Sequence, residues 1–153
     1  MTLRDRLERA LVRGHENDLD HLLYNERDHI DDLKILRDAA VLIAVTDRPE
    51  PGVIFVQRPQ HMRNHPGQVA FPGGKIDPGD RDPIDAALRE AHEEVALDRS
   101  HVDIIGMTDS FQSGSGYNIQ PVLGVIPPDL PFVADPTEVE SWFEAPLDFL
   151  LDP

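Results

Sequence analysis

Apolar positions repeat with the three- and four-residue spacing of an amphipathic helix in three segments of the chain. The first segment predicts a helix over residues 3–13, which Gly14 is expected to end. A weaker pattern predicts a second helix over residues 18–36. The clearest helix is predicted over residues 84–95, where Asp82-Pro83 supplies a cap and a first-turn proline.

Short apolar runs between turn residues predict the strands of a layered domain. The predicted strands cover residues 39–45, 53–57, 102–107, 119–126 and 138–143, and a short helix follows over residues 147–151. The first two strands form a hairpin, and Pro121 indicates an edge position or an irregular start for the fourth. Residues 58–74 lack periodicity and predict a long, shaped loop. Strands that alternate with helices indicate an α/β or α+β fold.

Length and composition narrow the class of protein. The chain has 153 residues and no cysteine, so we expect one domain without a thiol nucleophile or a Cys-ligated metal. An N-terminal helical segment, residues 1–36, is expected to pack on a domain formed by residues 37–153. The longest wholly apolar run, residues 39–45, is too short to span a membrane, and the N-terminus shows no apolar signal core. We therefore expect a cytoplasmic protein without a membrane partner.

The distribution of charge indicates the kind of ligand. Fourteen Lys and Arg residues oppose 29 Asp and Glu residues, which gives a net charge of −15. Residues 48–75 nevertheless carry +3, whereas residues 76–153 carry −14. The chain has no broad basic stripe, which argues against a nucleic-acid partner. A short basic segment in an acidic chain suits a small anionic ligand, although chance segregation would give the same pattern.

Three glutamates gather on one side of the predicted helix 84–95. At 100° per residue, Glu90, Glu93 and Glu94 share an arc of about 100°, and the apolar stripe lies on another side. Like charges at this spacing cost roughly 0.2–0.5 kcal/mol per pair, and Arg89 neutralises only part of that cost. Two explanations remain open: an ordinary solvated acidic face, or a site for a hard cation such as Mg²⁺, which prefers oxygen ligands.

The surroundings of these glutamates carry a longer motif. Gly74 is followed by five residues and Asp80, and eight further residues precede Arg89-Glu90-Ala91-His92-Glu93-Glu94. This pattern resembles the box that defines the Nudix hydrolase superfamily. Here Asp80 stands where glutamate is usual, the spacer is one residue longer, and Ala96 replaces the usual glycine after the helix.

A second motif lies immediately upstream and keeps the same register. Arg58, Arg63 and Gly67 precede Phe71-Pro72-Gly73-Gly74 at the spacing typical of the coenzyme A pyrophosphatase branch of that superfamily. Only Pro59 departs from the pattern. The longer spacer of the box is also typical of this branch, so the two motifs together point to it.

The resemblance implies a fold, an activity and a cofactor. The fold would be an α/β/α sandwich with a mixed β-sheet and a catalytic loop–helix–loop. The activity would be hydrolysis of a nucleoside diphosphate derivative at its P–O–P linkage, with Mg²⁺ or Mn²⁺. The branch implies coenzyme A or acyl-CoA as the substrate, cut to 3′,5′-ADP and 4′-phosphopantetheine. Hydrolysis of ADP-ribose or another nucleoside diphosphate, and non-catalytic nucleotide binding, remain as alternatives.

The resemblance also assigns roles to residues of this chain. The implied metal ligands are the Gly74 carbonyl, Glu90, Glu93 and Glu94, and the implied catalytic residues are Arg89, Glu93 and Glu138. The implied substrate contacts are Arg58, Arg63, Gly67 and Phe71. Arg89 would orient a ligand carboxylate by a bidentate contact. Glu138 would be an extra ligand or a water activator, a role for which Asp135 and Glu140 compete.

Other roles remain open for several of these residues. Arg58 and Arg63 are either phosphate contacts or salt-bridge partners of the abundant acids. Asp80 is expected to close the junction between the loop and the helix, or to cap a neighbouring group. Members of the branch are expected to continue beyond the segment near Leu147. One sheet face would then need cover from the N-terminal helices or from a second subunit, as in a homodimer.

Overall fold

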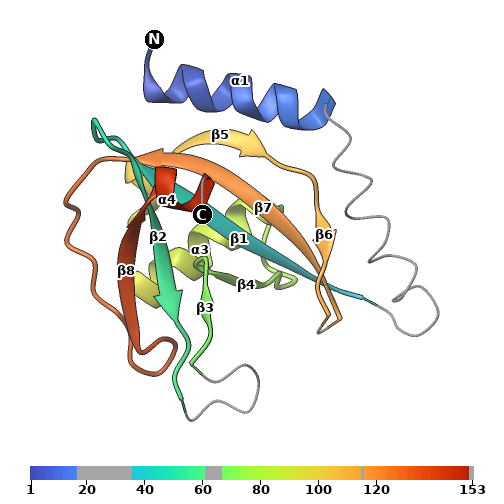
Figure 1. Ribbon diagram of the computed structural model, residues 1–153. Helices are drawn as coiled ribbons and strands as arrows, with labels where there is room; N and C mark the ends of the chain where they lie inside the picture. Colours follow the sequence, from blue (N-terminus) through green and yellow to red (C-terminus); the bar gives the residue numbers. More distant parts are fainter. Residues whose placement is uncertain (17–35, 61–66, 115, 152–153) are drawn as a thin grey trace.

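The computed structural model describes residues 1–16, 36–60, 67–114 and 116–151, and in these residues a mixed sheet of eight strands lies between helices (Figure 1). The strands are β1 (Arg37–Thr46), β2 (Gly52–Gln57), β3 (Val69–Ala70), β4 (Gly73–Lys75), β5 (Asp103–Met107), β6 (Phe111–Gln112), β7 (Tyr117–Ile126) and β8 (Ser141–Pro146). The helices are α1 (Leu3–Glu16), α3 (Pro83–Val95), the short 3₁₀ helix η1 (Arg99–His101) and α4 (Leu147–Leu151).

β1 occupies the middle of the sheet and pairs with three other strands. It runs parallel to β7 over its whole length of 10 residues. On its other side it pairs antiparallel with β2 near Val45 and with β4 near Ala40. A strand with neighbours on both sides and cover on both faces is expected to be apolar throughout, as residues 39–45 are. The sheet is therefore mixed, as the resemblance implied.

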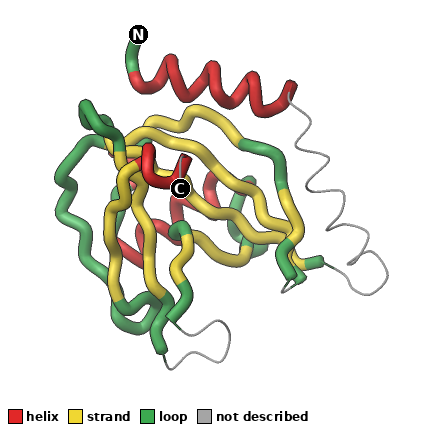
Figure 2. The backbone as a smooth tube through the Cα atoms, in the orientation of Figure 1, coloured by secondary structure: helices red, strands yellow, loops and turns green. Residues whose placement is uncertain are grey.

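α3 packs on one face of the sheet, and α1 and α4 pack on the opposite face (Figure 2). The larger core cluster joins the apolar side of α3 to β1 and β2, and includes the fully buried Leu42 and Ile54. On the opposite face, Leu3 and Leu7 of α1 and Leu147 of α4 pack on a smaller cluster. Each fully buried aliphatic side chain contributes roughly 1.5–3 kcal/mol to stability. The expected α/β/α arrangement is confirmed.

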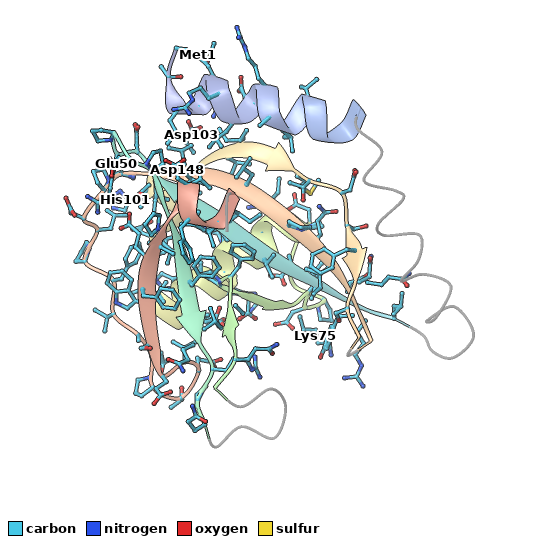
Figure 3. All side chains as sticks on the ribbon, viewed as in Figure 1. Met1, Glu50, Lys75, His101, Asp103 and Asp148 are labelled. Atoms are coloured by element: carbon cyan, nitrogen blue, oxygen red, sulfur yellow. The ribbon has the colours of Figure 1, made fainter. Side chains whose placement is uncertain are left out.

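α1 is held on strand β5 by an ion pair as well as by apolar contacts. Arg4 Nη1 lies 2.6 Å from Asp103 Oδ1, and Figure 3 shows Asp103 below the helix. Both side chains are strongly exposed, so this pair fixes the position of α1 more than it stabilises the fold. The helix predicted over residues 18–36 lies almost wholly outside the described residues. No helix in the described part of the chain is long and apolar enough to cross a membrane.

The bounds of α3 follow from its sequence signals. Asp82 Oδ1 accepts a hydrogen bond of 2.7 Å from the Asp85 N–H, and Pro83 occupies the first turn. Beyond the last turn, Ala96 adopts a left-handed backbone conformation with a φ of 61°. The helix predicted over residues 84–95 is therefore confirmed to within one residue.

The backbone conformation of Ala96 predicts that Ala96→Gly stabilises the protein. A left-handed conformation costs an L-residue roughly 1–2 kcal/mol, and glycine avoids this cost at the expense of extra freedom in the unfolded chain. We expect a net gain of about 1 kcal/mol in the free energy of unfolding, measured by urea denaturation. Ala96→Val is the matched variant and should lose stability, because a β-branched residue fits this conformation worse. Equal stability of the three proteins would contradict the strain at this residue.

Pro121 lies in an interior strand, so the prediction of an edge position is wrong. Its strand, β7, has β1 on one side and both β5 and β6 on the other. β5 ends at Met107 and β6 begins at Phe111, which leaves a gap opposite Pro121. The Pro121 carbonyl accepts a 3.2 Å bond from the Thr108 N–H on this side, and the proline nitrogen faces the same way. Because no strand residue lies opposite on this side, no backbone hydrogen bond is required from the proline nitrogen, and the sheet tolerates the proline.

Three predictions of element bounds also need correction. α1 continues past Gly14, because a single glycine costs a helix roughly 1 kcal/mol without ending it. The loop predicted over residues 58–74 contains the short strands β3 and β4. The last strand covers Ser141–Pro146 instead of residues 138–143, because the residues before it form a turn that docks on α3.

Candidate metal centre

The last turn of α3 and the two glycines of β4 lie in direct contact. Glu94 is 7% exposed, and its Oε1 atom accepts a hydrogen bond of 2.7 Å from the Gly73 N–H. Gly73 also packs closely on β1: an added Cβ would lie 2.7 Å from Val41 Cα and would meet the Ala40 carbonyl. Both contacts are with backbone atoms that cannot move aside, so only glycine fits at this position.

Glu90 occupies the neighbouring position on the helix, against Gly74. A Cβ atom on Gly74 would lie 2.8–3.0 Å from the atoms of the Glu90 carboxyl group. Burial raises the pKa of Glu90 above its usual value, while the positive charge of Arg89 acts in the opposite direction. The structure therefore brings Glu90 and Glu94 to the glycine pair, as the sequence indicated, and their role as metal ligands stays a prediction.

The pairing of β4 with β1 decides which backbone oxygen faces the glutamates. The Leu42 N–H donates to the Pro72 carbonyl, and two residues further along each strand Gly74 pairs with Ala40. Hydrogen-bonded pairs alternate in an antiparallel ladder, so the Gly74 carbonyl faces β1 and the polar groups of Gly73 face α3. The Gly73 carbonyl, and not that of Gly74, therefore lies on the α3 side of the strand, and the assignment of a backbone metal ligand stays a prediction.

Glu94 is the most strongly perturbed acid of the site. Burial raises its pKa to about 8, and the hydrogen bond from Gly73 acts against that increase. The negative charges of Glu90 and Glu138 raise the Glu94 pKa further, while Arg58 lowers it. Two poorly hydrated carboxyl groups of α3 and the exposed Glu138 thus repel one another. A divalent cation would offset this repulsion.

Arg89 connects the glutamates with the loop that precedes α3. Its Nε and Nη2 atoms lie 2.9 and 3.0 Å from the two carboxylate oxygens of Asp80, whose side chain is 4% exposed. Its Nη1 atom donates to Glu90 Oε1 at 3.1 Å and to Glu93 Oε1 at 3.2 Å. Asp80 also accepts a 2.8 Å bond from the Asp77 N–H, so it closes the junction between loop and helix. Arg89 is fixed at one edge and directs its other edge toward two carboxylates.

Glu93 lies beside Arg89, and 45% of its side chain is exposed. Among the described residues, no three acidic or histidine side chains are arranged as the ligands of one ion. The helix glutamates instead accept hydrogen bonds from Arg89 and from the Gly73 N–H. Binding of a cation would therefore require rotation of these carboxylates toward a common point.

The loop between β7 and β8 brings a further acid to the end of α3. The Asp135 N–H donates to the Glu94 carbonyl at 2.9 Å, and the fully buried Val139 anchors the loop in the core. Glu138 lies between these two anchors, and its charge raises the pKa of both Glu90 and Glu94. Of the three acids that the sequence left open, Glu138 is the one that the structure brings to the helix glutamates.

The two competing acids of this loop have other surroundings. Asp135 Oδ1 accepts hydrogen bonds from the Thr137 N–H at 3.0 Å and from the Thr137 hydroxyl at 2.8 Å. The Glu140 N–H donates to the Gln57 carbonyl at 2.8 Å, next to the first residue pair of β8 with β2. Asp135 thus shapes the turn, and Glu140 marks the point where the chain joins the sheet.

The residues predicted to contact the substrate do not share one environment in the structure. Arg58 and Gly67 face each other across the base of the loop, where the Gly67 N–H donates to the Arg58 carbonyl at 3.1 Å. Phe71 stacks on Phe55 with ring centroids 4.9 Å apart and belongs to the smaller core cluster, so packing alone accounts for its type. Arg63 lies outside the described residues.

The donor groups fit Mg²⁺ or Mn²⁺. The structure gathers carboxylate oxygens and one backbone carbonyl, which are the ligands that these hard cations prefer. The sequence did not single out Gly73, although the Gly-Gly pair was a visible signal, because its role depends on strand register. The link from Asp135 to α3 was also missed, and no local pattern indicates it.

Comparisons with known proteins show the family of this chain. Residues 36–151 match the NUDIX domain family. A protein from Escherichia coli named "Uncharacterized Nudix hydrolase NudL" is 53% identical over 111 residues, which cover 72% of this chain and 58% of that protein. The chain therefore spans less than two thirds of the length of this curated relative.

Solved structures share the fold. A Nudix hydrolase from M. smegmatis, RenU, has a TM-score of 0.64 at 21% identity, over 76% of this chain and 74% of that chain. The NUDIX domain of Shewanella oneidensis NrtR, solved in complex with ADP ribose, has a TM-score of 0.58 at 19% identity, over 79% of both chains. At these identities the two structures support the fold alone.

Fold and site together define a class: a layered α+β domain in which a glutamate-bearing helix lies against a Gly-Gly strand. Within that class, the chain belongs to the Nudix family. The expectation of a Nudix domain is thereby confirmed. The resemblance to the coenzyme A pyrophosphatase branch stays a prediction.

Proposed function

We propose that this chain hydrolyses the P–O–P linkage of a nucleoside diphosphate derivative, with Mg²⁺ or Mn²⁺ bound at the α3 glutamates. The observation that carries the proposal is the contact of Glu90 and Glu94 with the pair Gly73-Gly74. In this contact, two poorly hydrated carboxyl groups lie against the backbone of the glycine pair. Membership of the Nudix family supports the reaction class, since members of this family generally act on such substrates with divalent metals.

The reaction requires that the diphosphate be neutralised and that water be activated. A bound divalent cation neutralises phosphate charge and lowers the pKa of water. Glu90 and Glu94 would hold the cation together with the Gly73 carbonyl, and Arg89 would keep the Glu90 carboxylate oriented. The chain as a whole carries −15 and repels anions, so local positive charge is needed. Arg58, whose charge acts on Glu94, would attract a phosphate oxygen.

Two further glutamates complete the proposed machinery. Glu138 would add a carboxylate ligand from the loop between β7 and β8, because its charge acts on Glu94 and its side chain is exposed to solvent. Glu93 is exposed beside Arg89, and its carboxylate would accept the proton of the attacking water. Arg89 would orient the Glu93 carboxylate by the hydrogen bond that it already donates.

We further propose coenzyme A or an acyl-CoA as the substrate, cut to 3′,5′-ADP and 4′-phosphopantetheine. Coenzyme A differs from ADP-ribose by a 3′-phosphate and a long pantetheine arm. Recognition of these groups needs basic side chains and shaped surface beyond those used for the diphosphate. The segment from Arg58 to Gly74 would supply both: it carries Arg58 and Arg63, and the Gly67 N–H donates to the Arg58 carbonyl.

A product assay tests the proposed function. Coenzyme A, 3′-dephospho-coenzyme A and ADP-ribose would each be incubated with the protein in Mg²⁺, in Mn²⁺ and in EDTA, and the products separated by chromatography. We expect metal-dependent cleavage at the diphosphate, with coenzyme A turned over fastest. Preferred cleavage of ADP-ribose would retain the reaction class and overturn the substrate. Binding without cleavage of any of the three would show a nucleotide-binding domain.

The proposed substrate predicts a selective effect of Arg63→Ala. A charge-assisted contact to phosphate contributes about 1.5–3 kcal/mol, so its loss should lower kcat/KM for coenzyme A roughly tenfold to a hundredfold. Turnover of 3′-dephospho-coenzyme A should hardly change, because it lacks the group that Arg63 would contact. Arg58→Ala is the comparison variant and should impair both substrates. If Arg63→Ala lowers kcat/KM equally for both substrates, Arg63 contacts the diphosphate instead of the 3′-phosphate. If kcat/KM is unchanged for both, Arg63 serves as a salt-bridge partner.

A further inference from the structure

Asp135 joins α3 to the turn that carries Glu138 through its own polar groups. Its N–H donates to the Glu94 carbonyl at 2.9 Å, and its carbonyl accepts from the N–H groups of Glu138 and Val139 at 2.9 and 2.8 Å. Its Oδ1 atom accepts two bonds from Thr137, at 3.0 Å from the N–H and at 2.8 Å from the hydroxyl. Asp135 therefore both shapes the turn and attaches it to the helix, where the Val133 N–H makes a second attachment to the Val95 carbonyl at 3.0 Å.

The same turn is fixed at its far end. Val139 is fully buried in the core cluster that also holds the apolar side of α3. The Glu140 N–H bonds to the Gln57 carbonyl, where the chain enters β8. Residues 136–138 are exposed between the two anchors, and Pro136 restricts the first of them. The position of Glu138 is thus determined by Asp135 on one side and by Val139 on the other.

We propose that Asp135, together with Thr137, is a positioning residue that holds Glu138 at the metal side of α3. This inference rests on the proposed function, because it takes Glu138 as a ligand of the cation. Asp135 acts without touching cation or substrate: its carboxylate shapes the turn, and its N–H attaches the turn to Glu94. The side chain of Glu94 bonds in turn to Gly73, so helix, strand and turn meet at one residue.

The backbone of the turn is consistent with this role. The Glu138 N–H donates to the carbonyl of Asp135, whose own N–H donates to the Glu94 carbonyl, so two successive bonds connect Glu138 to the end of α3. A shift of the turn would therefore move Glu138 relative to α3.

Binding of Mn²⁺ alone tests the proposal, with free Mn²⁺ counted by electron paramagnetic resonance. We expect Asp135→Ala to weaken Mn²⁺ binding roughly tenfold, at the lower end of the range for groups that orient metal ligands. Thr137→Val keeps the side-chain shape and loses the hydroxyl bond, so a loss of about two- to fivefold is expected. Asp135→Asn and Thr137→Ser retain an acceptor and a hydroxyl, and should restore most of the affinity. Glu140→Gln, an acid of the same loop, should bind as the parent does.

The decisive comparison repeats these changes in a Glu138→Gln background. If Asp135 and Thr137 act through Glu138, their variants should change the affinity there by less than about twofold. Parent-like binding by Thr137→Val and Asp135→Ala, or full losses that persist in the Glu138→Gln background, would overturn the proposal. So would parent-like binding by Glu138→Gln itself. Parent-like binding by Glu90→Gln and Glu94→Gln would instead overturn the proposed function, so the two failures are distinguishable.

Discussion

Glu94→Gln should lower turnover of the preferred diphosphate by on the order of a hundredfold or more while leaving the fold intact. The amide keeps the shape of the side chain and can still accept the Gly73 N–H, but it loses the charge that binds the cation. A cation contributes several kcal/mol of charge stabilisation in such reactions, and each 1.4 kcal/mol corresponds to a tenfold change in rate. Steady-state kinetics at saturating Mg²⁺ measure the effect. Glu93→Gln should also lose most activity.

The same variant should be more stable than the parent protein in EDTA. Folding raises the pKa of Glu94 to about 8 from an ordinary value of 4.5, so the folded state binds the proton more tightly than the unfolded state. The parent therefore loses stability as the pH rises from 4.5 toward 8. We expect a gain on the order of 2 kcal/mol for Glu94→Gln at pH 8, which shrinks toward pH 5. Glu140→Gln is the matched control, and an equal gain there would contradict the assignment to buried charge.

Arg89→Met should lower both stability and cation affinity. The substitution leaves Asp80, whose side chain is 4% exposed, without its bidentate partner. Breaking a fully buried ion pair costs about 3–5 kcal/mol, and we expect about 2–3 kcal/mol here because a quarter of Arg89 is exposed. The carboxylates of Glu90 and Glu93 also lose the donor that orients them, which should weaken Mg²⁺ binding roughly tenfold to a hundredfold. Urea denaturation and a Mg²⁺ titration measure the two effects.

A double variant separates these two effects. Asp80→Asn combined with Arg89→Met removes the unpaired charge, so it should recover much of the stability and none of the cation affinity. The pH dependence has a definite sign: Arg89 lowers the pKa of Asp80, so the pair stabilises the fold above an ordinary pKa of 3.8. That contribution disappears as the pH falls below 3.8, and it should be absent from Arg89→Met. Recovery of cation affinity in the double variant would show that Arg89 does not orient the glutamates.

The local elements of this fold could be predicted where hydrophobic period and caps agree. The helix of the glutamates has an Asp-Pro start and an apolar stripe, and its bounds differ by one residue from the prediction. The prediction of an edge position for Pro121 was wrong because an interior strand can accept this proline opposite the gap between β5 and β6. No local sequence pattern reveals that gap. The prediction that Gly14 ends the first helix was wrong because the packing of α1 on the sheet outweighs the intrinsic cost of one glycine in a helix.

The site could be predicted only as far as its motifs are contiguous in sequence. Glu90 and Glu94 and the glycine pair belong to one motif, and the structure brings them into contact. The side to which the carbonyls of Gly73 and Gly74 point depends on ladder register, which sequence spacing does not encode. The placement of the loop that carries Glu138 depends on a backbone bond between segments about 40 residues apart.

The central claim is that Glu90 and Glu94 bind a divalent cation at the glycine pair. Its most direct measurement is the broadening of side-chain carboxyl ¹³C resonances by Mn²⁺ in protein labelled at glutamate. At low Mn²⁺, we expect the signals of Glu90 and Glu94 to broaden first and that of Glu138 with them, while Glu140 and Glu144 keep their line widths. First broadening of other glutamates, or equal broadening of all, would contradict the claim.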